Sequence, residues 1–167
     1  MKSQVKNYYS SEKKESLLFI GIGLVALSLA VIGLLYYKTN LWMGISVPLL
    51  SVAVIQLFTG LTIFFRTDRQ MKILLEQLEK TPQLFKEEET LRLKEINSNF
   101  NLYRNVELLV FLLGIFFLLM GGFANWGMMS LGIGIGLSLQ MGIMLSLDLF
   151  ANWRTELYLH EVKKFEA

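Results

Sequence analysis

Two acidic residues lie inside apolar stretches of the sequence, where a charge is costly. Glu107 stands near the start of one apolar run and Asp148 near the end of the next. Intramembrane carboxyl groups relay protons, bind ions or pair with basic residues. Both acids would lie near the same membrane surface, which favours ion pairing and leaves transport chemistry as the functional alternative. The candidate ion-pair partners are the basic residues expected near that surface: Arg66, Arg104 and Arg154.

Two glutamines stand near the middle of apolar runs. An amide without a hydrogen-bond partner costs several kcal/mol in hydrocarbon, so Gln56 and Gln140 should each find a partner. They could bond to each other and join two helices. The functional alternative is a polar pathway or a contact to a substrate.

The segment from Ser130 to Leu149 alternates small or polar residues with large ones. A period of two is typical of strands, but membrane strands occur only in closed barrels of many strands. We therefore predict a helix, on which residues four apart share a face. Its two rows are Ser130, Gly134, Ser138, Gly142 and Ser146, and Gly132, Gly136 and Gln140 followed by Asp148. Small residues permit close packing, against helices of the same chain, a partner helix or a second copy of the chain.

No other reactive combination of residues is visible. The chain has no cysteine, and its one histidine is His160. Cysteine chemistry is thereby excluded, and a histidine-based metal site is not expected. The net charge of +2 makes no case for nucleic acid as a partner. We expect neither an enzyme nor a bound metal or cofactor.

Four apolar blocks must position these side chains. A helix that crosses a membrane needs about 20 apolar residues. The blocks cover residues 17–37, 41–65, 106–124 and 128–150. The first block is too long for a signal peptide and lacks a cleavage site of small residues. We predict an all-α protein of the lipid bilayer, a single domain with four transmembrane helices in two hairpins.

Residues 66–104, between the second and third blocks, carry eight basic residues and two helical patterns. Apolar residues recur at helical spacing in both, and Thr81-Pro82 has the composition of a helix start. This predicts a cytoplasmic helical hairpin. The apolar positions are Met71, Leu74, Leu75 and Leu78 before the turn, and Leu93, Ile96, Phe100 and Tyr103 after it.

The tail, residues 151–167, is polar and compatible with a helix. Its expected packing side consists of Trp153, Leu157, Tyr158, Val162 and Phe165.

The basic residues predict the orientation. Four spans place both termini and the segment 66–104 on one side, which then carries 15 of the 16 lysines and arginines. Loops rich in Lys and Arg remain in the cytoplasm. We therefore expect a bacterial inner (cytoplasmic) membrane protein with both termini cytoplasmic.

An internal repeat is also suggested. At an offset of 84, Trp42 aligns with Trp126 and Gln56 with Gln140, and at an offset of 88 Arg66-Thr67 aligns with Arg154-Thr155. Apolar segments match each other easily, so chance similarity stays an alternative to duplication.

Several motifs resemble those of a loosely defined group of small bacterial four-span inner-membrane proteins. They are Gln56 and Gly60 before Arg66-Thr67-Asp68-Arg69-Gln70, Glu88-x-x-x-Arg92, Phe100-x-x-Tyr103-Arg104, GIGIGLSLQ at 132–140 and LDLFANWRTELY at 147–158. Some proteins of this shape resemble immunity proteins against membrane-active toxins. The resemblance implies no site residue.

Three functions follow from these features. The first is a non-enzymatic protein that binds a partner, such as a membrane-active toxin, by helix packing through the small-residue rows. The second is a small transporter or ion-translocating subunit that uses the intramembrane polar residues. The third is a structural subunit that holds another membrane subunit through its central hairpin.

Overall fold

The protein is built from long helices. In this computed structural model, which describes residues 1–166, 94% of the chain is helical and no strand occurs among those residues. The elements are α1 (Lys2–Ile32), continued by a short π-helix η1 (Gly33–Tyr37), α2 (Asn40–Lys80), α3 (Pro82–Phe123) and α4 (Met128–Lys164). This helical content confirms the all-α expectation. Four helices are long and apolar enough to cross a membrane.

Each helix is longer than its apolar block. The 41 residues of α2 span ~60 Å at 1.5 Å per residue, about twice the hydrocarbon thickness of a bilayer. The helix start at Thr81-Pro82 is confirmed, with Pro82 in the first turn of α3. α1 begins at Lys2, well before the apolar block that starts at residue 17, so the basic N-terminus is part of the helix. The tail is also helical as expected, except that Ala167 lies outside the described residues.

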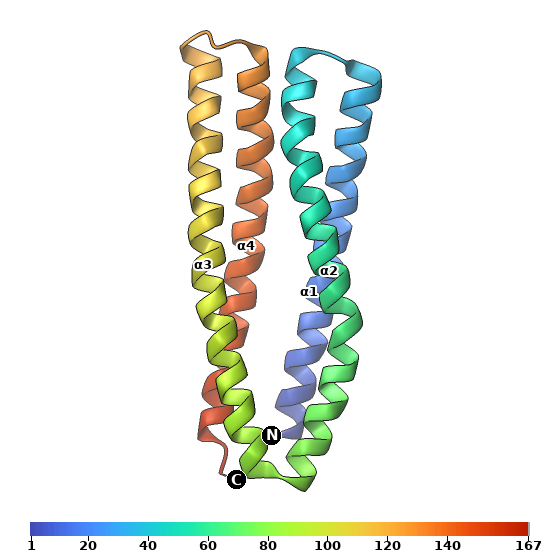
Figure 1. Cartoon of the computed structure of the whole chain (residues 1–167), viewed down its shortest axis with the longest axis vertical. Helices are drawn as coiled ribbons and strands as arrows, with labels where there is room; N and C mark the ends of the chain where they lie inside the picture. The colour runs from blue at the N-terminus through green and yellow to red at the C-terminus, as the bar shows by residue number, and fades with distance from the viewer. Residues whose placement is uncertain (167) are drawn as a thin grey trace.

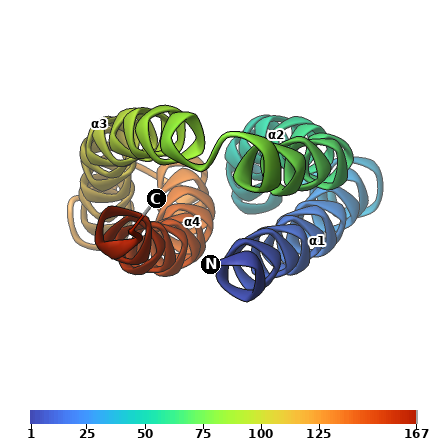
Figure 2. The same cartoon turned by 90° about the horizontal axis from the view of Figure 1, so that it is seen from below.

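The helices pack in a defined order. Figure 1 shows both termini and the α2–α3 connection at one end of the molecule, with the other two connections at the opposite end. α1 packs on α2 and α3 on α4, while α4 also packs on α2 (Figure 2). Within residues 1–166, no Cα atom of α1 lies within 8 Å of one in α3. α2 and α4 are therefore the helices that each pack on two neighbours.

Two regions of the molecule differ in composition. We call residues 17–65 and 106–150 the apolar half, and residues 1–16, 66–105 and 151–166 the charged half. Large side chains from all four helices form the core of the charged half. This core comprises Val5, Tyr8, Tyr9, Leu74, Leu78, Phe85, Leu93, Tyr158, Leu159 and Val162. In the apolar half, by contrast, the core cluster between α1 and α2 contains Ala26, Ala30, Leu49 and Ala53.

The prediction of which tail residues pack against the core was only partly right. Tyr158 and Val162 are buried and Phe165 packs against the core, but Trp153 and Leu157 are 61% and 51% exposed. Thr155 and Leu159 take their places, because the packed face runs 155, 158, 159, 162. Tyr103 is likewise exposed rather than packed.

Candidate functional site

The second small-residue row of α4 faces α2. A Cβ atom added at Gly132 would meet the carbonyl oxygen of Leu41 and lie 3.1 Å from the Cα of Gly44. The relation is reciprocal, because a Cβ at Gly44 would lie 3.1 Å from the Cα of Gly132. Gly136 continues the contact, where a Cβ would lie 2.8 Å from Pro48. Glycine is required here because the two backbones touch.

The first row faces α3. The Ser130 hydroxyl donates to the carbonyl oxygen of Phe117 at 3.1 Å, and a Cβ at Gly134 would meet the backbone of Leu118. Ser138 packs on Gly114, where an added Cβ would lie 2.7 Å from the serine oxygen. The contact then loosens towards the charged half. A Cβ at Gly142 would lie 3.5 Å from Phe111, and Ser146 is exposed.

Both rows are thus covered along most of their length by helices of the same chain. Of the interpretations left open by the sequence, packing within the chain is the one that these contacts show. A partner helix would have to bind elsewhere or displace α2 or α3.

The two glutamines bond to each other. Gln140 Nε2 donates to Gln56 Oε1 at 2.6 Å, and the side chains are 2% and 0% exposed. The pair joins α2 to α4 in the middle of the apolar half, as expected of interhelical packing. Gln56 Nε2 has no partner among residues 1–166, so half of this amide is left without a hydrogen bond.

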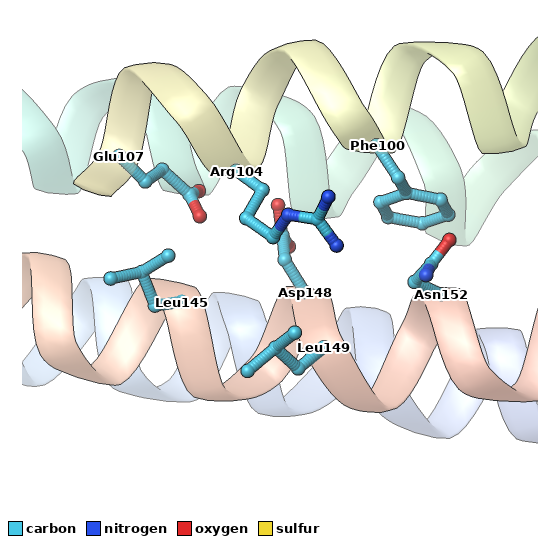
Figure 3. Close-up of a pocket in the computed structure, with 7 residues that line it drawn as sticks. All are labelled: Phe100, Arg104, Glu107, Leu145, Asp148, Leu149 and Asn152. Carbon is cyan, nitrogen blue, oxygen red and sulfur yellow. The ribbon is translucent and has the colours of Figure 1, made fainter. Parts of the chain in front are cut away.

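Glu107 and Asp148 meet in one pocket between α3 and α4. Figure 3 shows both carboxyl groups in the space between the two helices, with the Arg104 side chain beside them. Phe100 and Asn152 close the side towards the charged half. The structure therefore brings together the two acids of the apolar runs that the sequence singled out.

The expected ion pairs of these acids are not formed. Arg66 lies 3.8 Å from Glu12, and Arg154 pairs with Glu15. Arg104 lines the pocket, but its guanidinium donates to Asn101 Oδ1 at 2.9 Å. Among residues 1–166, neither Glu107 nor Asp148 has a cationic side chain within 4.0 Å. Arg66 and Arg154 both pair instead with acids of the N-terminal part of α1, before its apolar block.

A polar and aromatic network in the charged half was missed. Glu89 is fully buried, and Arg92 donates to it from Nε and Nη2, both at 2.7 Å. The Arg92 guanidinium also lies 5.5 Å from the centre of the Tyr9 ring. The signal lay in the first helix, where Val5, Tyr8, Tyr9, Glu12 and Ser16 recur at helical spacing and are all buried.

The tyrosines of this network are held neutral by burial. Tyr8 stacks on Tyr158 with ring centres 4.3 Å apart, and its hydroxyl lies 3.3 Å from Thr155 Oγ1. Burial raises the pKa of Tyr8, Tyr9 and Tyr158. Burial also raises the pKa of Glu15, and the facing Arg154 offsets part of that rise.

The two helix pairs repeat some of these contacts. Thr67 and Thr155 are both 1% exposed, and each donates to the carbonyl oxygen four residues earlier, Ile63 at 2.6 Å and Ala151 at 2.9 Å. Gly44 and Gly132, which face each other, are also related by the offset of 88. These equivalences fit the suggested repeat at the level of packing.

Chemically, the arrangement offers packing surfaces and protonatable groups. Residues 1–166 contain no group of three or more His, Cys, Asp or Glu side chains placed to hold a metal ion. No protein-family model matches the chain, and neither a curated protein nor a solved structure matches it.

Proposed function

We propose that this chain is a non-enzymatic, multi-pass protein of the bacterial inner membrane that binds a partner by helix packing. Its four helices would cross the bilayer as two hairpins, joined by a cytoplasmic helical hairpin, with both termini in the cytoplasm. The end that carries the termini and the α2–α3 connection holds 15 of the 16 basic residues, which supports this orientation.

The observation that carries partner binding is the exposed face of α3. Only 11% of the most apolar stretch of α3 is buried, against 33% for α4. Large apolar residues line that face at helical spacing: Val106, Leu109, Leu113, Phe116 and Phe123. Because the small-residue rows of α4 are already covered, we place the partner on this face of α3. The partner class is a membrane-active toxin, for which the protein would be an immunity protein, or another membrane subunit.

The test removes this face without touching the core. Leu109, Leu113 and Phe116 are changed together to alanine, and the protein is purified from its host in mild detergent. We expect the variant to fold and to lose the co-purifying membrane protein, and cells carrying it to lose their membrane potential under toxin challenge. The matched control changes three exposed apolar residues of α2, Val54, Ile55 and Phe58, and should keep the partner.

Three outcomes separate the alternatives. A particle of twice the expected protein mass that reverts to one chain in the α3 variant identifies a second copy as the partner. A folded α3 variant that keeps its partner contradicts the proposed surface. If no protein co-purifies and the membrane potential under toxin challenge does not depend on the protein, the proposed function is contradicted.

A small transporter or ion-translocating subunit is a second candidate, favoured by the polar residues in the apolar half. Gln56 and Gln140 form a polar contact at its middle, and Glu107 and Asp148 share a pocket near its end. Reconstituted protein would then carry ions or substrate across liposomes, and Glu107→Gln with Asp148→Asn would abolish the flux. Unchanged flux in that double variant would remove the acids from the transport path.

A further inference from the structure

The pocket between α3 and α4 contains buried hydrogen-bond acceptors that no donor among residues 1–166 satisfies. It is about large enough for one water molecule and lies where the apolar half meets the charged half. Glu107 is 8% exposed, and its Oε2 atom has no hydrogen-bond partner among residues 1–166. Asn152 Oδ1 is also buried and unpartnered in that part of the chain, because the amide of Asn152 donates outwards to Glu156. A buried acceptor left without a donor loses its hydration without compensation, so this pocket requires a donor.

No cationic side chain donates a hydrogen bond to these acceptors. Within residues 1–166, the charged or titratable side chains that line the pocket are Glu107 and Arg104 of α3 and Asp148 of α4, and none comes from α1 or α2. Arg104 is exposed and donates to Asn101, and it forms no ion pair with either acid. Two carboxylates in a poorly hydrated pocket repel strongly unless one of them is neutralised.

The oxygen atoms suit a proton better than a metal ion. Hard cations such as Ca²⁺ and Mg²⁺ take about six or more oxygen ligands. Only three side chains, those of Glu107, Asp148 and Asn152, present oxygen atoms to this pocket. A single proton on one carboxyl removes one negative charge and creates an O–H donor, which the other carboxyl group can accept.

We propose that Glu107 and Asp148 form a proton-binding site, in which one proton is shared between the two carboxyl groups and holds α3 to α4. This inference does not depend on the partner proposed above. Pairs of neighbouring carboxyl groups that share one proton are an established arrangement in proteins.

The proton-binding site can change the packing of α3 on α4 only near the two acids. Further into the apolar half, α3 and α4 are in backbone contact at Gly114, Gly121 and Gly134, and a helix fixed at these points cannot separate there. Near the acids the nearest glycine contact is the looser one at Gly142. On the other side of the acids, α3 and α4 meet again in the core of the charged half, through Phe85 of α3 and Val162 of α4. Loss of the proton would therefore separate α3 from α4 locally at the acids, while the interface on either side stays closed.

Infrared spectroscopy tests for the proton directly, because a protonated carboxyl group absorbs separately from a carboxylate. The full-length protein in lipid vesicles should show the protonated band at neutral pH and lose it on alkaline titration. Glu107→Gln with Asp148→Asn should remove the band. The matched control is Glu89→Gln, since Glu89 is also buried but is ion-paired with Arg92, and this change should leave the band unchanged.

A distance measurement tests the opening. The chain has no cysteine, so Val106→Cys and Phe150→Cys place two spin labels at exposed positions on α3 and α4 beside the site. We expect the label distance to increase over the same pH range as the band is lost, and to be independent of pH in the Glu107→Gln, Asp148→Asn background.

Three results would overturn the proposal. The first is the absence of a protonated band at neutral pH, and the second is a band that persists in the double variant. The third is a band that disappears when Na⁺, K⁺, Mg²⁺ or Ca²⁺ is added at constant pH, which would identify a metal-ion site instead.

Discussion

The apolar half and the charged half of the same four helices pack by different means. In the apolar half, helices meet through glycine, serine and alanine, with backbone contact at Gly44 and Gly132. In the charged half they meet through large aromatic and aliphatic side chains, including Tyr9 and Phe85. In water, burying large apolar side chains is favourable because it removes them from the solvent. In lipid this driving force is absent, because the lipid tails are as apolar as leucine. Close backbone contact and interhelical hydrogen bonds are what remain to join helices in a bilayer.

The buried polar groups follow the same division. The charged half contains the ion pair of Glu89 with Arg92. In the apolar half the polar contact is a neutral amide pair, Gln56 with Gln140, and the acids Glu107 and Asp148 share a pocket without a cation. The difference predicts that removing a charge destabilises the charged half most, and that enlarging a side chain destabilises the apolar half most.

The largest effect should come from Arg92→Ala. It leaves the fully buried Glu89 without its cation, and breaking a buried pair from one side costs about 3–5 kcal/mol. The free energy of unfolding, measured by denaturant titration in mixed micelles, should fall by that amount. Changing both Glu89 and Arg92 to leucine should recover most of the loss. A single variant as stable as the parent would show that Glu89 does not depend on the pair.

The next effect concerns the glycine contacts. Gly132→Ala pushes a methyl group into the backbone of α2, and overpacking costs about 1–3 kcal/mol. Gly142→Ala adds the same group where Phe111 lies 3.5 Å away, an ordinary contact. The same titration should find the second variant within about 0.5 kcal/mol of the parent. Equal losses in the two variants would contradict close backbone packing at Gly132.

Gln140→Leu should have a smaller effect. It removes the donor to Gln56 and leaves that side chain fully buried without a partner. Hydrogen bonds between membrane helices are worth about 0.6 kcal/mol on average and up to about 1.7 kcal/mol. Changing both glutamines to leucine should restore stability, because no amide then lacks a partner. A double variant that is less stable than the single one, again by denaturant titration, would indicate a different role for the pair.

The smallest effect at neutral pH should come from Tyr9→Phe, since the Tyr9 hydroxyl is buried without a partner among residues 1–166. Its stability should change by less than about 0.5 kcal/mol. Burial raises the pKa of Tyr9 in the folded state, and this determines how stability changes at alkaline pH. The unfolded tyrosine loses its proton above about pH 10 while the folded one keeps it, so stability falls as pH rises. Unfolding followed from pH 8 to pH 11 should show a weaker fall in the variant. Parallel curves would contradict the neutral, buried tyrosine.

Local signals in the sequence predicted where α3 and α4 start. Proline at the first helical position marks the start of α3, and the turn before Met128 marks the start of α4. The N-terminal turns of α1 were missed because lysines surround the buried positions Val5, Tyr9 and Glu12. Helical spacing was present there, but the number of charges concealed it.

The candidate site was only partly accessible to sequence reasoning. Composition identified Gln56, Gln140, Glu107 and Asp148, because polar residues in apolar runs need no alignment to be noticed. Their partners depend on the register and rotation of helices that are distant in the chain. A shift of one residue along a helix turns a side chain by about 100°. The basic partners of Glu107 and Asp148 were therefore predicted wrongly, although the two acids do lie at the same level of the helices, in one pocket.

The sequence by itself determined the secondary structure, the four apolar segments and the charge asymmetry, since these depend on residues near each other in the chain. Only the tertiary structure decided which helix covers each row of α4, that Arg66 and Arg154 pair with α1, and that Glu107 and Asp148 share a pocket without a cation. The physical reason is that hydropathy and helix propensity are properties of local segments. Close packing and ion pairing depend on the distances between segments, which are fixed only when all four helices are in place.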